Sequence, residues 1–507
     1  MSHHRDQSLP LLDRRIFLKS TALAGGALLA GVPFGQAHAA SPVLKVGTRT
    51  LEVNGKAAKV FQIEGPGGTS GVFAREGDRL SGALLNASSE PLQMHWHGQV
   101  KAPANQDRAR PDGGALARNQ ADLHDFELTP GTHWMHSHTL SEQQLLAAPM
   151  VTREKDAGDI QDVVIMLHDF AFRSPQEILA ELGGSDAHAG HGAQPAPRSG
   201  PARQMSPPMH GGPGMHGMGG HGMHGMGGPR GGHGGHRMGM THANDVRYDA
   251  YLANERTLDD PQVVKVEKGG RVRLRIINGG TATAFVISTP GLTSRAVAVD
   301  GTPCEPVQRA TYPLAQGQRL DLAVEIPREG GTFSVLAQVE DATFLTGIIL
   351  ATAGANIARR ATAATQKEGF LDLAFESVLR AATPLPIMRP QSSFVAMLGE
   401  EPGYRWTING SIHGEHEPFR VRKGDRVEIT FMNPTSMMHP MHLHGHHFQV
   451  VALGGRRFSG PIRDTVIVPA HTPVTIAFVA VHRGSWFLHC HHLYHMATGM
   501  MTEMQIS

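Results

Sequence analysis

Residues 424–433, with the sequence GDRVEITFMN, recur in altered form at two earlier places in the chain. The earlier copies are residues 77–86 and residues 269–278, and in every copy a Gly and an Asn stand nine residues apart. Apolar residues fill alternate positions in the last two copies, which is typical of a half-buried strand after a turn. The three copies therefore predict three β-rich domains of one kind.

A second recurring element supports this division. The pairs Gly131-Thr132, Gly331-Thr332 and Gly484-Ser485 each open another run with strand character. Strands, frequent turns and little helical periodicity indicate an all-β chain of three β-sandwich domains. A chain of 507 residues is long enough for about three domains. Lys and Arg (46) almost balance Asp and Glu (45), so the composition predicts no basic surface for nucleic acid.

An insert of different composition separates the first two domains. Residues 175–244 are rich in Gly, Pro, His and Met, and the sequence MHGM at residues 215–218 returns eight residues later. Almost nothing in this insert can pack a core, so we expect it to be disordered. The predicted domains are residues 40–174, residues 245–365 and residues 366–507.

The first 39 residues have the pattern of an export signal. Arg14-Arg15 precedes an apolar run over residues 21–32, and Ala37-His38-Ala39 offers a small-x-small cleavage site. Paired arginines before a weakly apolar stretch resemble a twin-arginine signal, whose route carries folded protein. The run is too short for a membrane helix, and no later segment predicts a membrane span. We expect residues 1–39 to direct the folded protein to a bacterial periplasm or outside the cell.

Histidine pairs occupy matched places in the first and third domains. We counted from the Asn that ends each repeat and from the Gly that opens the second element. Identical offsets give His95 and His97, His136 and His138, His442 and His444, and His489 and His491. The same offsets in the second domain give Ile287, Thr289, Leu336 and Gln338. Residues i and i+2 of a strand share one face, so we predict a metal-binding cluster of imidazoles between the first and third domains. Imidazole suits copper, zinc, iron and nickel.

The third domain carries a further set of metal-capable side chains. Cys490 lies between the two histidines of its pair, so its thiol points to the opposite face of the strand. His439 precedes the pair on the earlier strand, and His495 and Met500 follow Cys490. Two His, a Cys thiolate and a weak axial Met form the ligand set of a blue-copper electron-transfer site. Cys304 is then left over, and we predict a buried free thiol there.

These motifs resemble those of the three-domain multicopper oxidases. The similarity rests on His95-Trp96-His97-Gly98, His136-Ser137-His138, His439-x-x-His442-x-His444 and His489-Cys490-His491-x-x-x-His495-x-x-x-x-Met500. With the Met/His insert, the chain looks most like the bacterial copper-resistance branch, beside its laccase-like relatives. The resemblance implies three cupredoxin-like domains, four copper ions, and one-electron oxidations of a substrate coupled to reduction of O2 to water.

The resemblance also implies a role for each ligand. It assigns the type 1 copper to His439, Cys490, His495 and Met500, the type 2 copper to His95 and His442, and the type 3 pair to His97, His136, His138, His444, His489 and His491. Electrons that arrive at the type 1 site would reach the cluster through Cys490, which is covalently joined to two of its histidines.

Two positions depart from the family pattern. Relatives carry a carboxylate, used as a proton relay, where this chain has Leu493 and Met496. Asp112 is the remaining candidate for a catalytic acid, although Pro-Asp-Gly also makes a simple turn. We expect Asp464 to be a surface-loop carboxylate, with guidance of a cationic substrate as the alternative. The histidines outside the ligand set are expected to be packing or exposed residues: His413, His416, His446, His447 and His492.

Several functions are compatible with this site. The first is oxidation of Cu(I) in copper tolerance, and the second is laccase-type oxidation of phenols or aromatic amines, with Mn(II) oxidation beside it. A non-enzymatic envelope protein and a copper store acting through the insert alone are further alternatives, and the complete ligand set argues against both. Residues 205–242 hold eight Met and seven His, and thioether sulfur selects Cu(I). We therefore expect this segment to capture Cu(I) and pass it to the type 1 site.

Overall fold

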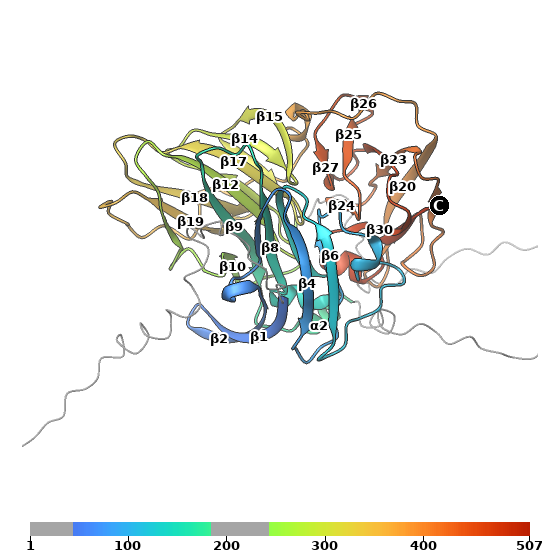
Figure 1. Ribbon diagram of the computed structural model, residues 1–507, viewed down its shortest axis with the longest axis horizontal. Helices are drawn as coiled ribbons and strands as arrows, with labels where there is room; N and C mark the ends of the chain where they lie inside the picture. Colours follow the sequence, from blue (N-terminus) through green and yellow to red (C-terminus); the bar gives the residue numbers. More distant parts are fainter. Residues whose placement is uncertain (1–43, 184–242) are drawn as a thin grey trace, which may run out of the picture. The chain divides into compact units, whose positions relative to one another are not determined.

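The computed structural model describes residues 44–183 and 243–507, which belong to one compact unit. The predicted export signal and the Met/His-rich part of the insert lie outside these residues. The described chain is built mainly of strands in six sheets, and the colours of Figure 1 follow the chain from the first strands in blue to the last in red. The all-β prediction is therefore confirmed. No helix in the two described stretches is long and apolar enough to cross a membrane.

The first sandwich consists of a sheet of order β2-β1-β4-β6 and a sheet of order β3-β8-β7-β5. Its strands are β1 (Leu44–Val53), β2 (Lys56–Glu64), β3 (Val72–Arg75), β4 (Arg79–Asn86), β5 (Met94–His97), β6 (Ala121–Glu127), β7 (Gly131–Ser137) and β8 (Ala147–Arg153). Leu80 and Leu84 of β4 are buried in one hydrophobic core with Trp96 of β5 and Met135 of β7. The first copy of the repeat therefore anchors this core.

The second sandwich consists of sheets of order β10-β9-β12-β17-β14-β15 and β11-β19-β18-β13-β16. Its strands are β9 (Gln161–Phe170), β10 (Ala250–Ala253), β11 (Val263–Lys265), β12 (Arg271–Asn278), β13 (Phe285–Ser288), β14 (Ser294–Val299), β15 (Thr302–Gln308), β16 (Thr311–Leu314), β17 (Arg319–Glu325), β18 (Thr332–Val339) and β19 (Leu345–Ala351). β9 lies within residues 40–174, the range predicted for the first domain, but it pairs with β10 and β12. The boundary predicted at residue 174 is therefore too late. It was placed at the change in composition, whereas the chain enters the second sandwich earlier, at β9.

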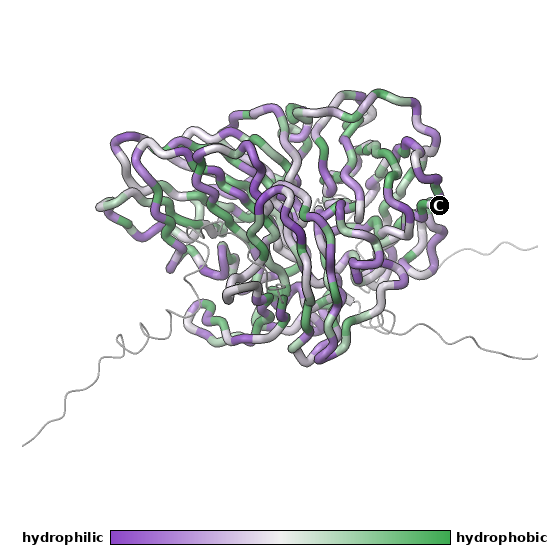
Figure 2. Tube along the Cα trace, in the orientation of Figure 1, coloured by the Kyte–Doolittle hydropathy of each residue, from purple (hydrophilic) through white to green (hydrophobic). Residues whose placement is uncertain are grey.

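The third sandwich consists of a sheet of order β21-β20-β23-β29-β25-β26, in which β27 also pairs with β25, and a sheet of order β22-β31-β30-β24-β28. Its strands are β20 (Ser392–Glu401), β21 (Arg405–Ile408), β22 (Phe419–Val421), β23 (Arg426–Met432), β24 (His439–Leu443), β25 (Phe448–Leu453), β26 (Arg456–Arg457), β27 (Ile462–Arg463), β28 (Thr465–Val468), β29 (Val474–Val479), β30 (Gly484–Cys490) and β31 (Met501–Ile506). The alternating Val427, Ile429 and Phe431 of β23 are fully buried in its core. Figure 2 shows the same concentration of hydrophobic residues in the strands of each sandwich.

The Asn that ends each repeat makes equivalent hydrogen bonds in all three sandwiches. The side-chain amides of Asn86, Asn278 and Asn433 each donate to two backbone carbonyls, one in the following loop and one farther along the chain. Each Asn Oδ1 accepts from the backbone N–H two residues on. All three are buried, so the amide satisfies loop groups that water does not reach.

A helix replaces the start of the predicted insert. α2 (Pro175–Glu181) begins with a capping box between Ser174 and Glu177, which satisfies two backbone N–H groups of its first turn. Ile178 and Leu179 are buried beside Tyr494 of α3 (Leu493–Ala497). The prediction of disorder from residue 175 is therefore wrong for this helix, because two buried apolar residues and a cap are enough to dock a short helix.

Candidate metal centre

The predicted histidines lie on two strand pairs, one in the first sandwich and one in the third, or directly after the end of a strand. His95 of β5 faces His136 of β7 as a Cα partner, and His442 of β24 faces His489 of β30. His95 also stacks on His444 with ring centroids 3.7 Å apart, which joins the two sandwiches. The structure brings together all eight imidazoles, and all are buried: His95, His97, His136, His138, His442, His444, His489 and His491.

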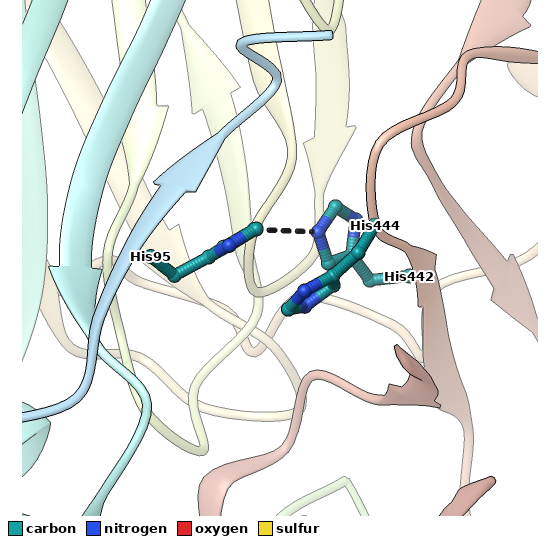
Figure 3. Close-up of side chains that lie close together, drawn as sticks. All are labelled: His95, His442 and His444. Carbon is teal, nitrogen blue, oxygen red and sulfur yellow. Dashed lines mark hydrogen bonds between the residues drawn. The ribbon is translucent and has the colours of Figure 1, made fainter. Parts of the chain in front are cut away.

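Two of these rings point a nitrogen at each other across the sandwiches. His95 Nε2 lies 3.2 Å from His442 Nε2 (Figure 3). Their outer nitrogens are held in place, since His95 Nδ1 lies 2.7 Å from the carboxylate of Asp107 and His442 Nδ1 donates to the carbonyl of Asp464 at 2.8 Å. An outer nitrogen held in this way leaves the inner nitrogen bare and oriented for a metal ion.

A second group of three histidines has the same construction. His489 Nε2 lies 3.1 Å from His138 Nε2 and 3.0 Å from His444 Nε2. His444 Nδ1 donates to the carbonyl of Ala109, and His489 Nδ1 donates to the carbonyl of Cys490. Three inner nitrogens therefore converge on one point.

The remaining three histidines leave nitrogens without partners. His97 Nδ1, His136 Nε2 and His491 Nε2 are buried and have no hydrogen-bond partner among the described residues. Their ring centroids lie 5.1 to 5.6 Å apart, and the carboxylate of Glu142 lies 3.0 Å from His136 Nδ1. Leaving three buried nitrogens unpaired is costly, so a bound cation fits here. The three groups match the donors needed by a type 2 copper and a type 3 pair.

Burial keeps six of the eight imidazoles neutral. It lowers the pKa of His489 to about 3, and with neighbouring imidazoles it holds the pKa of His138, His442 and His444 well below the usual 6.5. A neutral imidazole keeps the lone pair that binds a metal, whereas a protonated one does not. These six imidazoles therefore keep their lone pairs for a metal ion at neutral pH.

A separate donor set lies in the third sandwich. Cys490 Sγ lies 3.7 Å from His439 Nδ1 and 3.7 Å from His495 Nδ1, and the two nitrogens are 3.3 Å apart. Met500 is fully buried, and its carbonyl accepts from the Cys490 N–H at 3.0 Å. Burial raises the pKa of Cys490 above its ordinary value, so a thiolate here needs a bound cation. The set fits the type 1 copper that the resemblance implies.

The same motifs are found by comparison with known families. Three family profiles, each described as multicopper oxidase, match residues 45–156, residues 232–356 and residues 388–507. The chain belongs to the multicopper oxidase family. This multicopper oxidase is therefore an oxidoreductase that uses copper.

Similar proteins include copper-resistance and laccase relatives. The oxidase is 28% identical to multicopper oxidase MmcO of Mycobacterium tuberculosis, over 85% of this chain and 80% of the relative. It is 23% identical to a copper resistance protein A homolog of Pseudomonas syringae pv. tomato, over 91% and 92%. Among solved structures, Fet3p, a multicopper oxidase that functions in iron import, matches with a TM-score of 0.69 at 16% identity over 92% and 90%. The laccase from Botrytis aclada matches with a TM-score of 0.69 at 21% identity over 91% and 86%. At such identities the solved structures establish the fold of the oxidase.

Asp107 of the oxidase lies beside the cluster, whereas the position of Asp112 does not agree with the catalytic role predicted for it. The Asp112 side chain is 79% exposed and pairs with Arg110, so it does not touch the buried imidazoles. The Gly113 N–H donates to the Arg110 carbonyl, which is the simple turn that the sequence also allowed. Asp107 is 9% exposed and contacts His95. The Pro-Asp-Gly motif points to Asp112, although Asp107 is closer in sequence to the His-x-His pair.

Asp464 of the oxidase is buried, whereas the sequence predicts a surface-loop carboxylate. Its side chain is 1% exposed, and its Oδ1 accepts from His97 Nε2 at 3.0 Å. The neighbouring Thr465 begins β28 and is the Cα partner of His442. That register carries Asp464 to the cluster, and it depends on a strand pairing that the local sequence does not reveal.

Beside the type 1 donor set of the oxidase lies a further carboxylate that sequence reasoning missed. Asp245 Oδ2 lies 3.6 Å from His495 Nε2, and Asp245 Oδ1 lies 3.2 Å from His492 Nε2. The His492 ring stacks on the His495 ring with centroids 3.7 Å apart. No sequence motif marks Asp245, which directly follows the predicted insert. The buried free thiol predicted at Cys304 is confirmed.

Proposed function

We propose that this multicopper oxidase oxidises Cu(I) to Cu(II) and couples that oxidation to the four-electron reduction of O2 to water in a bacterial periplasm. The proposed complement is four copper ions, held by the type 1 ligands His439, Cys490, His495 and Met500 and by the eight-histidine cluster. Bound copper supplies one-electron redox chemistry at both places. Cys490 is covalently joined to two histidines of the cluster, so the chain itself supplies a short path between them.

The contacts of His495 support a small cation as the substrate. The His495 ring is fully buried, and the carboxylate nearest its Nε2 belongs to Asp245, whose side chain is 19% exposed. Asp245 also accepts from the Tyr404 hydroxyl and pairs with His492. The Asp245 side chain is partly exposed although its Oδ1 is buried, and a carboxylate beside an imidazole attracts a small cation. A bulky neutral phenol would find no exposed edge of His495 to contact.

The Met/His-rich segment supports a soft cation as substrate. Residues 205–242 lie outside the described residues, and in sequence they end shortly before Asp245. Thioether sulfur selects Cu(I) and keeps its lone pairs at acidic pH, where imidazoles become protonated. Many weak ligands on one chain raise the local concentration of the ion. We propose that this segment captures Cu(I) and supplies it to Asp245.

Oxygen uptake with Cu(I) and with a phenol tests the substrate. In Asp245→Asn, the amide keeps the shape but loses the charge, so kcat/KM for Cu(I) should fall about tenfold while kcat/KM for the neutral phenol holds. Asp249→Asn is the matched control, because Asp249 is an exposed carboxylate on the same segment and is expected to change neither rate. Equal losses with both substrates in Asp245→Asn would contradict Cu(I) as the substrate.

Deletion of residues 205–242 tests the segment. Oxidation at low Cu(I) should slow, and phenol oxidation should hold or improve. If Cu(I) kinetics are unchanged by the deletion, the capture role is wrong and laccase-type oxidation becomes the leading function.

The proposed location rests on the first 39 residues, which lie outside the described part of the chain. We propose that Arg14-Arg15 directs export of the folded oxidase. Replacement of both arginines by lysine should leave the protein in the cytoplasmic fraction with its signal uncleaved, and normal export of this variant would contradict the proposal.

A further inference from the structure

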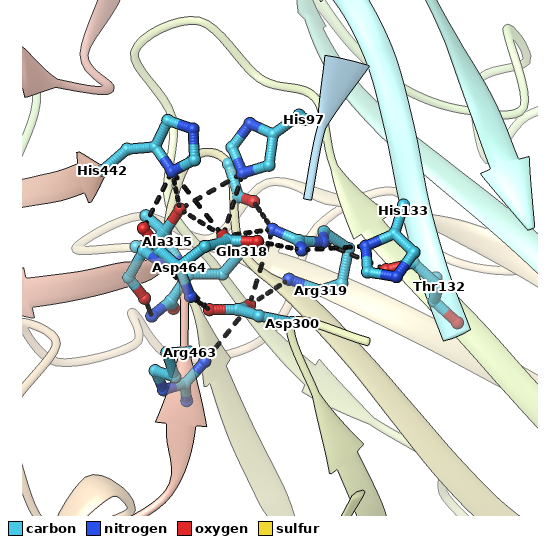
Figure 4. A network of polar contacts seen from close by, with 12 residues as sticks. His97, Thr132, His133, Asp300, Ala315, Gln318, Arg319, His442, Arg463 and Asp464 are labelled. Atoms are coloured by element: carbon cyan, nitrogen blue, oxygen red, sulfur yellow. Dashed lines mark hydrogen bonds and ion pairs between the residues drawn. The ribbon is translucent and has the colours of Figure 1, made fainter. Parts of the chain in front are cut away.

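Asp464 lies where the three sandwiches meet, between the cluster and a chain of buried charges (Figure 4). Its carboxylate accepts from His97 Nε2 of the first sandwich at 3.0 Å. Its backbone carbonyl accepts from His442 Nδ1 of the third sandwich at 2.8 Å. The Thr465 hydroxyl bridges the two, because it lies 3.1 Å from His442 Nδ1 and donates to Asp464 Oδ1 at 3.0 Å. One residue therefore holds ligands from two sandwiches.

Arg319 of β17, in the sandwich without predicted copper ligands, holds this carboxylate. Its guanidinium donates to both oxygens of Asp464, from Nη1 at 2.7 Å and from Nη2 at 2.5 Å. Two remaining donors reach the carbonyls of Thr132 and Gly317 at 3.1 and 3.0 Å. The Arg319 side chain is fully buried. Such a planar two-pronged pair fixes orientation as well as charge.

The charges behind Arg319 are paired in turn. The backbone N–H of Arg319 donates to Asp300 Oδ1 at 2.9 Å. Asp300 Oδ1 in turn lies 3.3 Å from Arg463 Nη1. Arg463 is paired with the buried Glu376 at 2.9 Å. Each buried charge from Asp464 to Glu376 therefore has an oppositely charged partner.

The orientation of His97 depends on the position of this carboxylate. Nδ1 of His97 is the nitrogen without a partner, and its Nε2 donates to Asp464. In His95, His442, His444 and His489, the outer partner holds Nδ1 and leaves Nε2 bare. His97 therefore presents the opposite nitrogen to the cluster, and only a fixed acceptor on its far side keeps the proton on Nε2.

We propose that Arg319 is a positioning residue of the trinuclear cluster: it locks Asp464 so that His97 presents Nδ1 and His442 presents Nε2 to the metal. The sandwich without copper ligands thereby takes part in building the cluster. The close packing of Gly98 supports a rigid arrangement. A Cβ at Gly98 would lie 2.7 Å from Arg319 Nη2 and 3.1 Å from Asp464 Oδ2. This inference rests on the proposed binding of copper by the eight histidines and not on the identity of the substrate.

Copper content and the spectra of Arg319→Met test the proposal. The variant should keep the blue thiolate-to-copper absorbance of the type 1 site while losing copper and the type 2 electron paramagnetic resonance (EPR) signal from the cluster, with cluster affinity lower by about 10–100-fold. Arg319→Lys keeps the positive charge but not the two-pronged pair with Asp464. Its cluster copper content should therefore lie between those of wild type and Arg319→Met. Arg319→Met combined with Asp464→Asn should be no worse than Asp464→Asn alone, because the arginine acts through that carboxylate.

Arg275→Met is the matched control. Arg275 is equally buried in the same sandwich and pairs with Glu154, Asp162 and Asp321, none of which is a predicted ligand. It should keep its cluster copper. If Arg275→Met loses cluster copper to the same extent, or if Arg319→Met retains the full type 2 signal, the positioning role is wrong. Should Arg319→Met not fold, an unaltered type 2 spectrum in Asp464→Asn overturns the proposal. Wild type without cluster copper would instead overturn the proposed function.

Discussion

At the scale of single residues, the site depends on the partner of each outer imidazole nitrogen. Backbone carbonyls serve His444 and His489, while carboxylates serve His95, His97 and His136. A carboxylate partner makes the ring a stronger base and fixes its tautomer more firmly than a carbonyl does. The carboxylates are therefore the positions where a single substitution should disturb metal binding most.

We expect Asp107→Ala to weaken copper binding at the cluster by about 10–100-fold, because His95 loses the acceptor that orients it. The type 2 EPR signal and the copper-to-protein ratio measure this loss. Asp112→Ala is the matched control, since it lies on the same loop, is 79% exposed and contacts no ligand. Equal copper loss in the two variants would show that the loop, and not the Asp107 carboxylate, is responsible.

Cys490→Ser should abolish the blue absorbance and the oxidase activity, because a hydroxyl does not replace the thiolate ligand or the electron path through it. The fold should survive, since the substitution removes no bulk from the core. Absorbance, oxygen uptake and far-UV circular dichroism measure these outcomes. A copper-loaded Cys490→Ser variant that stays blue would rule out Cys490 as the type 1 ligand.

At the scale of elements, one pair of neighbouring strands explains where the ligands stand and where they are absent. β5 with β7 and β24 with β30 carry the histidines. In the second sandwich β13 pairs with β18 in the same role, and Val286 faces Gln338 there. Strand pairing is thus common to all three sandwiches, and only the side chains differ. The strand pairing therefore does not depend on the presence of the histidines.

Glu340 follows β18 and predicts a pH-dependent stability. Its Oε1 accepts from the Leu371 N–H, its Oε2 is buried without a partner among the described residues, and burial raises its pKa from 4.5 to about 7. The folded state therefore binds more protons than the unfolded state between these values, so stability falls as pH rises through this window. Above pH 7 the full cost is present, on the order of 3 kcal/mol.

Glu340→Gln removes that titration. Relative to wild type, the variant should gain free energy of unfolding as pH rises from below 4.5 to above 7. Denaturant unfolding of both proteins across this range measures the difference. A difference that is constant with pH would mean that Glu340 has an ordinary pKa in the folded protein.

At the scale of the whole molecule, the cluster joins the sandwiches. Its ligands come from the first and third, and Arg319 of the second holds one of their supports. A ligand that binds only the folded state adds stability by mass action. Because the donors are shared, copper should stabilise the first and third sandwiches together and not separately.

Removal of copper with a chelator should therefore lower the Tm of the holoenzyme by several degrees, because about 2.7 kcal/mol is lost for a ligand present at a hundred times its Kd. Differential scanning calorimetry measures the shift, and re-addition of copper should reverse it. Cys490→Ser, which keeps the cluster, should retain most of the stabilisation. A chelated protein with an unchanged Tm would contradict a cluster that joins two sandwiches.

The all-β class, the three repeats and the side chains of the cluster follow from the amino-acid order alone. Strand periodicity places residues i and i+2 on one face, and the repeat shows that two strand pairs are equivalent. Both signals are local, so His95 and His442 were found without knowledge of the fold. Which carboxylates meet the imidazole rings depends on the folded chain, as Asp107, Asp245 and Asp464 show. Burial of a carboxylate and the strand register that brings it to a ring depend on elements distant in sequence. For the same reason, β9 lies in the second sandwich although its sequence adjoins the first.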